Sequence, residues 1–165
     1  MKEFKVNDYI SLRLESSKTI IYIKGKIFNQ CKRLLLNIPV DKISTFEKIQ
    51  SVDEASEELI KENSSNEIKL SPDLEFWGHC SNLQIWAEND YDTRLLHRNL
   101  AFPLLKELVK VGDLKAKRVF NEEIAKRIEI GYFPVLEYLI LEGYPSYLNN
   151  DQIFLLFDIL IAKKN

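Results

Sequence analysis

The side chains best suited to covalent chemistry lie in the segment EFWGHCSNLQIW. It places His79 beside Cys80, with a tryptophan on either side, and His97 follows in the chain. A thiolate with an imidazole base nearby is the arrangement that cysteine-dependent hydrolases and acyltransferases use. Such an enzyme, built on Cys80 and His97, is therefore one hypothesis for this chain.

The enzyme hypothesis requires a specific local structure around Cys80. Gly78 would have to end one helix and Ser81 would have to cap the next. Cys80 would then lie just before a helix N-terminus, where the helix dipole stabilises a thiolate. Since catalytic triads are recognised by geometry and not by position in the sequence, the sequence leaves this hypothesis open.

His97 would be the general base of that enzyme, and Asp90 or Asp92 would orient its ring. A zinc site is a further alternative, with four plausible ligands: Cys31, His79, Cys80 and His97. An adjacent histidine and cysteine are poorly spaced for one metal ion, because CxxC or HxxxH spacing is what lets both groups reach the same centre. None of the five glycines stands in the order of a phosphate-binding loop. We therefore expect no metal and no other cofactor.

The same segment has a second interpretation, as part of a hydrophobic core. Trp77, Cys80 and Trp86 would pack between a β-rich N-terminal part and the helices that follow, and His79 or His97 would be satisfied by hydrogen bonds. The flanking tryptophans favour this interpretation, because large aromatic side chains bury more area than any other kind. We prefer it, and we expect no catalytic residue.

The elements that would position these residues begin with strands. In ISLRLESSKTIIYIKGKIF (10–28) the apolar residues alternate, SSK forms a turn, and a β-branched run follows. This predicts a hairpin, with a second turn at Gly25 and a short third strand. Residues 28–35 have helical spacing, so we expect a short helix in which Cys31 is a small apolar filler.

The next signals concern helix and module boundaries. Ser51 and Glu54 form a capping box, which predicts a helix start. The polar stretch KENSSNE then predicts a soft boundary. We expect a β-rich module over residues 1–65 and a helical array over residues 66–165, packed together as one globular unit.

An internal repeat of 31 residues runs through the second half. FPLLKELVKVGD (102–113) aligns with FPVLEYLILEGY (133–144), and one step back lies SPDLEFWGHCSN (71–82). The shared columns hold a proline, two apolar residues and, in the later copies, a glycine. They predict buried positions at Trp77, Leu105, Leu108, Leu136 and Leu139.

Proline suits the first turn of a helix, and Gly112 and Gly143 would end helices in the left-handed conformation. A second helix fits in each unit, over about 92–100, 114–130 and 150–163. The last two carry apolar faces: Phe120, Ile124 and Ile128, then Phe154, Phe157 and Ile161. The sequence thus predicts an α+β fold, with a small N-terminal sheet and about six helices in antiparallel pairs, resembling a short helical-repeat array. An irregular helical bundle is the alternative.

Composition limits the function classes. With 165 residues and 45% hydrophobic residues, the chain can form a globular core. Runs such as IFLLFDILIA fall short of the roughly 20 residues needed to span a bilayer. The start, MKEFKVNDYI, lacks the apolar region of a secretory signal. We expect a cytoplasmic protein that does not engage membranes.

Charge is distributed unevenly along the chain. Residues 41–93 carry 4 basic and 13 acidic groups, whereas residues 94–127 carry 9 basic and 4 acidic ones. A charged protein partner or self-association would fit this pattern. Because no dense basic patch with exposed aromatics is visible, we do not expect nucleic-acid binding.

Four residues are candidate binding residues. Arg94 and Arg98 have i, i+4 spacing and would face a partner or pair with the acids of ENDYDTR. Tyr132 and Tyr144 belong to an aromatic-rich stretch, and aromatic residues are favoured as interface anchors. Core packing would explain these tyrosines equally well.

Three stretches, IIYIKGKIFNQCKRLLLNIP, EFWGHCSNLQ and YDTRLLHRNLAFPLL, resemble an uncharacterised domain common in archaeal proteins, often on the N-terminal side of leucine-rich repeats. The resemblance covers most of the chain, although the LxxLxLxxN repeats themselves are absent. It implies a module of interaction proteins and supplies no activity or catalytic residues. We therefore expect a non-enzymatic protein-interaction or adaptor module, with a partner of unknown identity and with oligomers possible.

Overall fold

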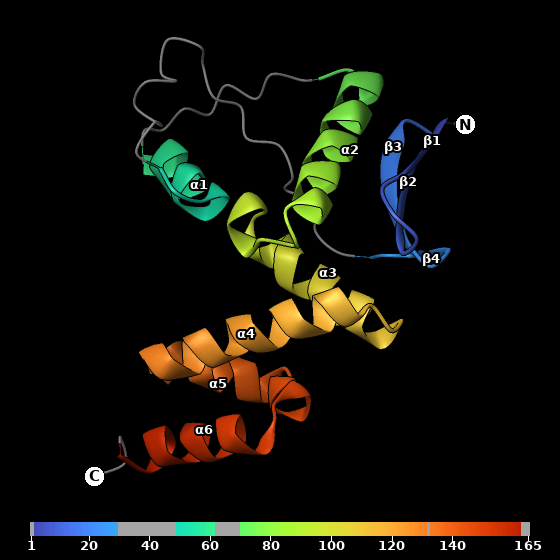
Figure 1. The fold of residues 1–165 in the computed structure, drawn as a ribbon. Coiled ribbons are helices and arrows are strands. Elements are labelled where there is room, and N and C mark those ends of the chain that lie inside the picture. Colours follow the sequence, from blue (N-terminus) through green and yellow to red (C-terminus); the bar gives the residue numbers. More distant parts are fainter. Residues whose placement is uncertain (1, 30–48, 62–69, 132, 163–165) are drawn as a thin grey trace. The chain divides into compact units, whose positions relative to one another are not determined.

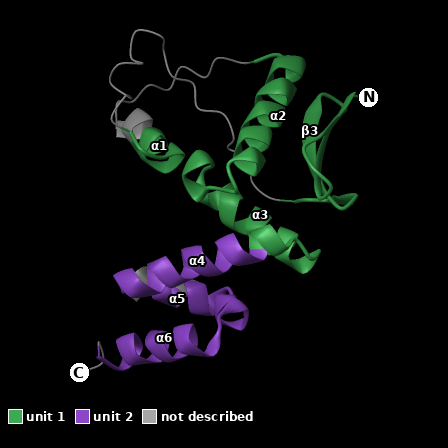
Figure 2. Cartoon of the chain, viewed as in Figure 1, with its two compact units in different colours: residues 1–116 green, residues 117–165 purple. Residues whose placement is uncertain are grey.

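The computed structural model describes four stretches of the chain: residues 2–29, 49–61, 70–131 and 133–162. It shows an antiparallel sheet followed by six α-helices, which confirms the α+β class (Figure 1). The chain forms two compact units, Met1–Ala116 (unit 1) and Lys117–Asn165 (unit 2), coloured separately in Figure 2. Three expectations lie outside the described residues: the helix through Cys31, the boundary near residue 65 and the position of Tyr132.

Unit 1 begins with a four-stranded sheet of sequential order: β1 (Lys2–Lys5), β2 (Ile10–Glu15), β3 (Lys18–Ile23) and β4 (Lys26–Ile27). The predicted hairpin and its short third strand, here β4, are present. The turn residues Ser16 and Ser17 have φ values of 47° and 62°, as a two-residue hairpin turn requires. The edge strand β1 was not predicted, because KEFK has too little alternation to stand out.

The helices are α1 (Val52–Lys61), α2 (Pro72–Glu88), α3 (Arg98–Lys110), α4 (Leu114–Ile130), α5 (Phe133–Leu141) and α6 (Asn150–Ala162), with short 3₁₀ turns η2 (Thr93–Leu95) and η3 (Tyr144–Tyr147). The capping box of α1 is confirmed, since the Ser51 hydroxyl accepts from the Glu54 amide at 3.2 Å. Helix α2 begins at Ser71 in the same way, and Pro72 occupies its first turn.

Helix α2 packs on the sheet through β2 and β3 (Figure 1). Its buried face includes Phe76, Cys80 and Leu83, and the buried residues of the sheet include Leu12 and Ile21, which pair with each other across the hairpin. Burial of apolar area of this kind is the main favourable term in folding. The core of unit 1 thus places the segment around Cys80 in its interior.

The apolar columns and glycine ends of the repeat are confirmed in its second and third copies, whereas its first copy is wrong. In the later copies the apolar columns are buried and glycines with φ of 89° and 73° follow the helices: Leu105, Leu108, Leu136, Leu139, Gly112 and Gly143. In the first copy Leu74 and Trp77 are 58% and 48% exposed. Ser81 occupies the position that holds a glycine in the later copies, so α2 does not end there and continues to Glu88. The face of α2 that is buried is therefore not the face that the repeat predicted.

The helix expected over 92–100 is also corrected. That stretch forms η2 and then the start of α3, whose N-cap is His97. Pro103 is therefore inside α3 and not in its first turn. The helix tolerates Pro103 although a proline inside a helix removes one intrahelical hydrogen bond. The prediction that the aligned prolines mark helix starts was therefore wrong for α3.

In unit 2, the successive helices α4, α5 and α6 alternate in direction, so that each is antiparallel to the one before it (Figure 1). The predicted face of α4 is confirmed, since Phe120, Ile124 and Ile128 are buried. The predicted face of α6 is wrong, because its three residues are exposed: Phe154, Phe157 and Ile161. Helix α6 is apolar on almost every side, so its pattern could not show which side packs.

We expect Ser71→Ala to lower the free energy of unfolding by about 1 kcal/mol, because the amide of Leu74 loses its capping acceptor. Urea denaturation followed by tryptophan fluorescence reports on α2, which carries both tryptophans. Ser81→Ala is the matched control, since Ser81 is an exposed residue inside the same helix. An equal loss in both variants would contradict the capping role.

Candidate functional site

Cys80 lies in the middle of α2 with 1% of its surface exposed. Burial raises the pKa of its thiol to about 11, so the neutral form dominates at physiological pH. Gly78 and Ser81 are interior residues of the same helix and neither end nor begin one. The local structure that the enzyme hypothesis required around Cys80 is therefore absent, and the core interpretation of Cys80 and Trp86 is confirmed.

The core interpretation also included Trp77, and for this residue it is wrong. Its ring is half exposed and makes edge contacts with Phe4 of β1 and with Phe76, at centroid distances of 6.0 and 5.2 Å. The buried face of α2 and the row with Leu74 and Trp77 lie on opposite sides of the helix. Trp77 thus borders the sheet and also faces solvent.

The two histidines have structural contacts of different kinds. His79 is buried, and its Nε2 lies 3.2 Å from a Glu75 carboxylate oxygen one turn earlier. His97 caps α3: its Nδ1 accepts from the Asn99 amide at 3.2 Å, and its Nε2 lies 3.5 Å from Asp53 of α1. His97 is therefore held by α1 and by its own helix.

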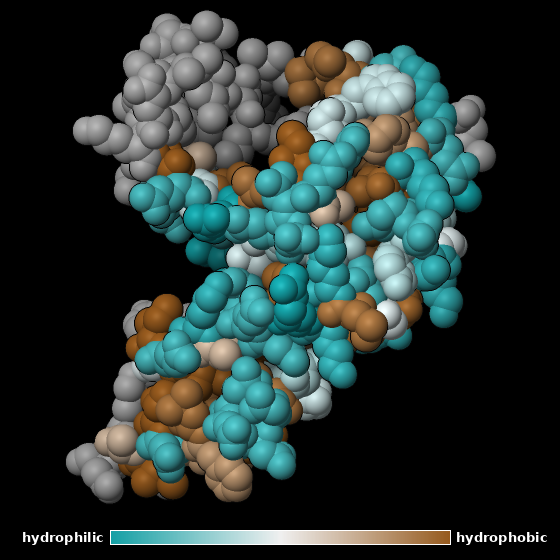
Figure 3. Space-filling view, viewed as in Figure 1, coloured by the Kyte–Doolittle hydropathy of each residue, from teal (hydrophilic) through white to brown (hydrophobic). Residues whose placement is uncertain are grey.

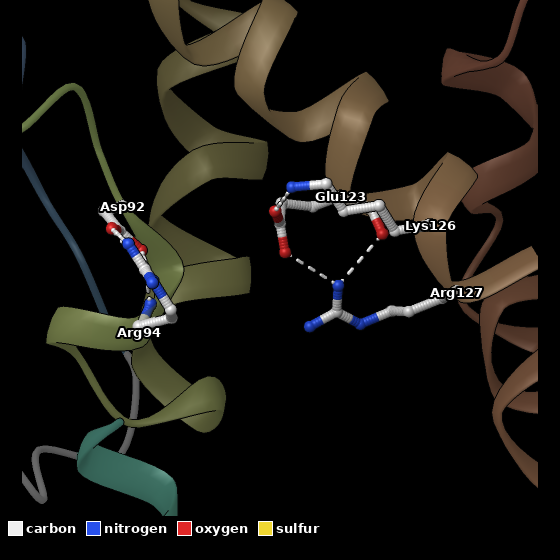
Figure 4. A network of polar contacts seen from close by, with 5 residues as sticks. All are labelled: Asp92, Arg94, Glu123, Lys126 and Arg127. Atoms are coloured by element: carbon white, nitrogen blue, oxygen red, sulfur yellow. Dashed lines mark hydrogen bonds and ion pairs between the residues drawn. The ribbon is translucent and has the colours of Figure 1, made fainter. Parts of the chain in front are cut away.

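Asp92, expected to orient His97, instead binds Arg94. Its carboxylate caps η2 by accepting from the Arg94 amide at 3.0 Å, and it accepts from the guanidinium at distances down to 2.6 Å (Figure 4). Asp53 is the carboxylate beside His97. The expected set of Cys80, His97 and Asp92 thus divides among a core residue, a helix cap and a surface ion pair.

The two candidate arginines do not share a helix. Arg94 lies in η2, whereas Arg98 is the first residue of α3. The Arg98 amide donates to Asp53 at 3.0 Å, and its guanidinium lies 3.6 Å from Glu57. Exposed pairs of this kind stabilise weakly, and both arginine side chains are more than half exposed.

Unit 2 contains a comparable local pair on α4, where Glu123 accepts from Arg127 at 2.9 Å and from Lys126 at 2.8 Å (Figure 4). Tyr144, expected at a binding surface, is a core residue with 2% exposure. Its ring meets Phe120 edge-on at 5.4 Å. The prediction that Tyr144 is a binding residue at the surface is therefore wrong, and the core-packing alternative holds for it.

A buried polar cluster that the sequence did not reveal centres on Tyr91. The Tyr91 hydroxyl donates to Asp113 at 2.6 Å and accepts from Asn7 at 3.0 Å. Burial, with the Asp113 carboxylate beside it, raises the pKa of Tyr91 well above its usual range. Asp113 also accepts from the Ala116 amide, so the cluster caps α4. Every polar group in it has a structural partner, which is typical of a buried network that specifies packing.

Within the described parts of the chain, no group of three or more histidine, cysteine, aspartate or glutamate residues could hold a metal ion. None of the described helices combines the length and apolar character needed to cross a membrane.

No protein-family model, curated protein or solved structure matches this chain. The resemblance to the archaeal domain stays a prediction.

A second feature that the sequence analysis did not predict is a pair of exposed apolar rows. The α2 row is Leu74, Trp77 and Ile85, and the α6 row is Phe154, Phe157 and Ile161; all six side chains are at least 48% exposed. Figure 3 shows apolar surface over the lower part of unit 2, where α5 and α6 lie. An available signal was that α2 has apolar residues on two opposite faces, only one of which can pack on the sheet.

Cys80 should resist thiol reagents in the folded protein. With Cys31 replaced by serine, we expect labelling across pH 5 to 9 only after unfolding in urea, because the thiol is buried and its pKa is about 11. Labelling rates measured with and without urea test this. Rapid labelling of the native protein with an apparent pKa below about 8.5 would contradict the buried position.

Tyr91→Phe should lower the free energy of unfolding of unit 1 by roughly 1–3 kcal/mol, since Asp113 and Asn7 each lose a buried hydrogen-bond partner. The measurement is again urea denaturation by tryptophan fluorescence. Tyr9→Phe is the control, because its ring keeps the contact with Lys24 in either form. A loss below the control's would show that the Tyr91 hydroxyl is dispensable.

Proposed function

We propose that this chain is a non-enzymatic protein-interaction or adaptor module that acts in the cytoplasm. The observation that supports it is the presence of an exposed apolar row on each of two helices, the α2 row and the α6 row. Scattered apolar residues are normal on protein surfaces, but aligned ones with aromatic members are typical of interfaces. The burial of Cys80 removes the main support for the thiol-enzyme alternative.

Each row has the form of a helix face that could bind a partner. Trp77 lies within the α2 row, and tryptophan is among the residues that most often dominate binding energy. The α2 row belongs to unit 1 and the α6 row to unit 2, so each unit carries one candidate contact surface. An adaptor needs such regions and needs no reactive group.

The proposal is tested by retention of proteins from a lysate of the source cell on the immobilised chain. We expect the wild type to retain specific proteins that are lost, by about tenfold or more, with Leu74→Ser/Trp77→Ser or with Phe154→Ser/Phe157→Ser. Leu114→Ser, which changes a 79% exposed leucine outside both rows, is the matched control. Equal retention by all four proteins, or no specific retention by any, would contradict the module.

A further inference from the structure

Helix α6 is an apolar helix with few buried residues. Only Leu156 among its residues is buried, although nine of its thirteen residues are apolar. A helix that is apolar on most sides normally belongs in an interior. The α6 row, with i, i+3 and i+7 spacing, is the geometry by which one helix receives another.

The charged side chains of α6 itself are both carboxylates, Asp151 and Asp158. The basic residues of unit 2 lie elsewhere in its sequence, at Lys117, Arg118, Lys126, Arg127, Lys163 and Lys164. On α6 itself, Asp151 and Asp158 are exposed and lie three residues before and four after Phe154. The apolar row therefore has a negative border on its own helix.

We infer that the α6 row is the docking surface for an amphipathic helix of another protein, one whose apolar face is bordered by lysine or arginine. This inference rests on the proposed interaction function and names its surface and partner class. The apolar face of the partner would cover Phe154, Phe157 and Ile161, and its cations would meet Asp151 and Asp158. Complementary charge of this kind favours the right partner and speeds association.

The same charges disfavour two other occupants. A second copy of the chain would bring its own carboxylates to the contact if it used the same face, and like charges at an interface cost affinity. An anionic membrane surface would be repelled by the same groups. The partner that satisfies both the row and its border is a basic amphipathic helix.

The test uses two labelled synthetic helical peptides of about 18 residues, long enough to form a helix. Both have leucine along one face; one has lysine beside that face and the other has glutamate. Fluorescence anisotropy with the full chain measures each Kd. We expect the lysine peptide to bind at least tenfold more tightly than the glutamate peptide, with an affinity that falls as salt is raised.

Three variants locate the binding. Phe154→Ser/Phe157→Ser should weaken the lysine peptide about tenfold or more, because its apolar face loses its contacts. Asp151→Asn/Asp158→Asn should reduce the preference for lysine over glutamate to about threefold or less. Leu114→Ser should change neither value. The substituted side chains are exposed, and circular dichroism of each variant checks that the helices remain.

Equal binding of the two peptides, or lysine-peptide binding that survives the double phenylalanine substitution, would overturn the inference. Sedimentation of the chain alone distinguishes the second-copy occupant: a wild-type dimer that becomes monomeric in Phe154→Ser/Phe157→Ser would also overturn it. If these tests fail while lysate proteins are still lost with the α2-row variant, the interaction module stands and only the α6 assignment fails.

Discussion

The hydrogen bond from Tyr91 to Asp113 is the contact on which the arrangement of unit 1 depends. This hydrogen bond joins the turn that follows α2 to the start of α4. Asn7, in the turn between β1 and β2, donates a second hydrogen bond to the Tyr91 hydroxyl and so connects the sheet to the same cluster. Tyr91 itself has a φ of 60°, a left-handed conformation that is unfavourable for a tyrosine. The hydrogen bonds and the contact of its ring with Trp86, at 4.6 Å, hold it in that conformation.

The Tyr91 cluster could not be predicted from the sequence, although several local features of the fold could. The hairpin, the cap at Ser51, the glycine ends at Gly112 and Gly143, and the buried face of α4 are local patterns, and each was predicted. Tyr91 and Asp113 are 22 residues apart, and Asn7 is 84 residues from Tyr91. No spacing rule connects such positions, because the sheet and α2 bring them together only after packing.

The errors at Trp77 and on α6 have a related cause. Both helices are apolar on opposite faces, so sequence periodicity identifies helices there without showing which face packs. The repeat assigned Trp77 to the inside by analogy with Leu108 and Leu139, whose helices end at glycines. Helix α2 has no such end and packs on a sheet, which selects the face of Phe76, Cys80 and Leu83 and turns the α2 row outward.

The distribution of residue types between interior and surface carries the functional argument. Among the described residues, Cys80 is in the core, His79 is buried beside Glu75, and His97 caps a helix. Large apolar side chains, which cost free energy when left in water, are aligned on the surface instead. The rows on α2 and α6 are the surfaces that the proposed binding role uses, and the two charged side chains of α6, Asp151 and Asp158, are the basis for proposing a basic partner there.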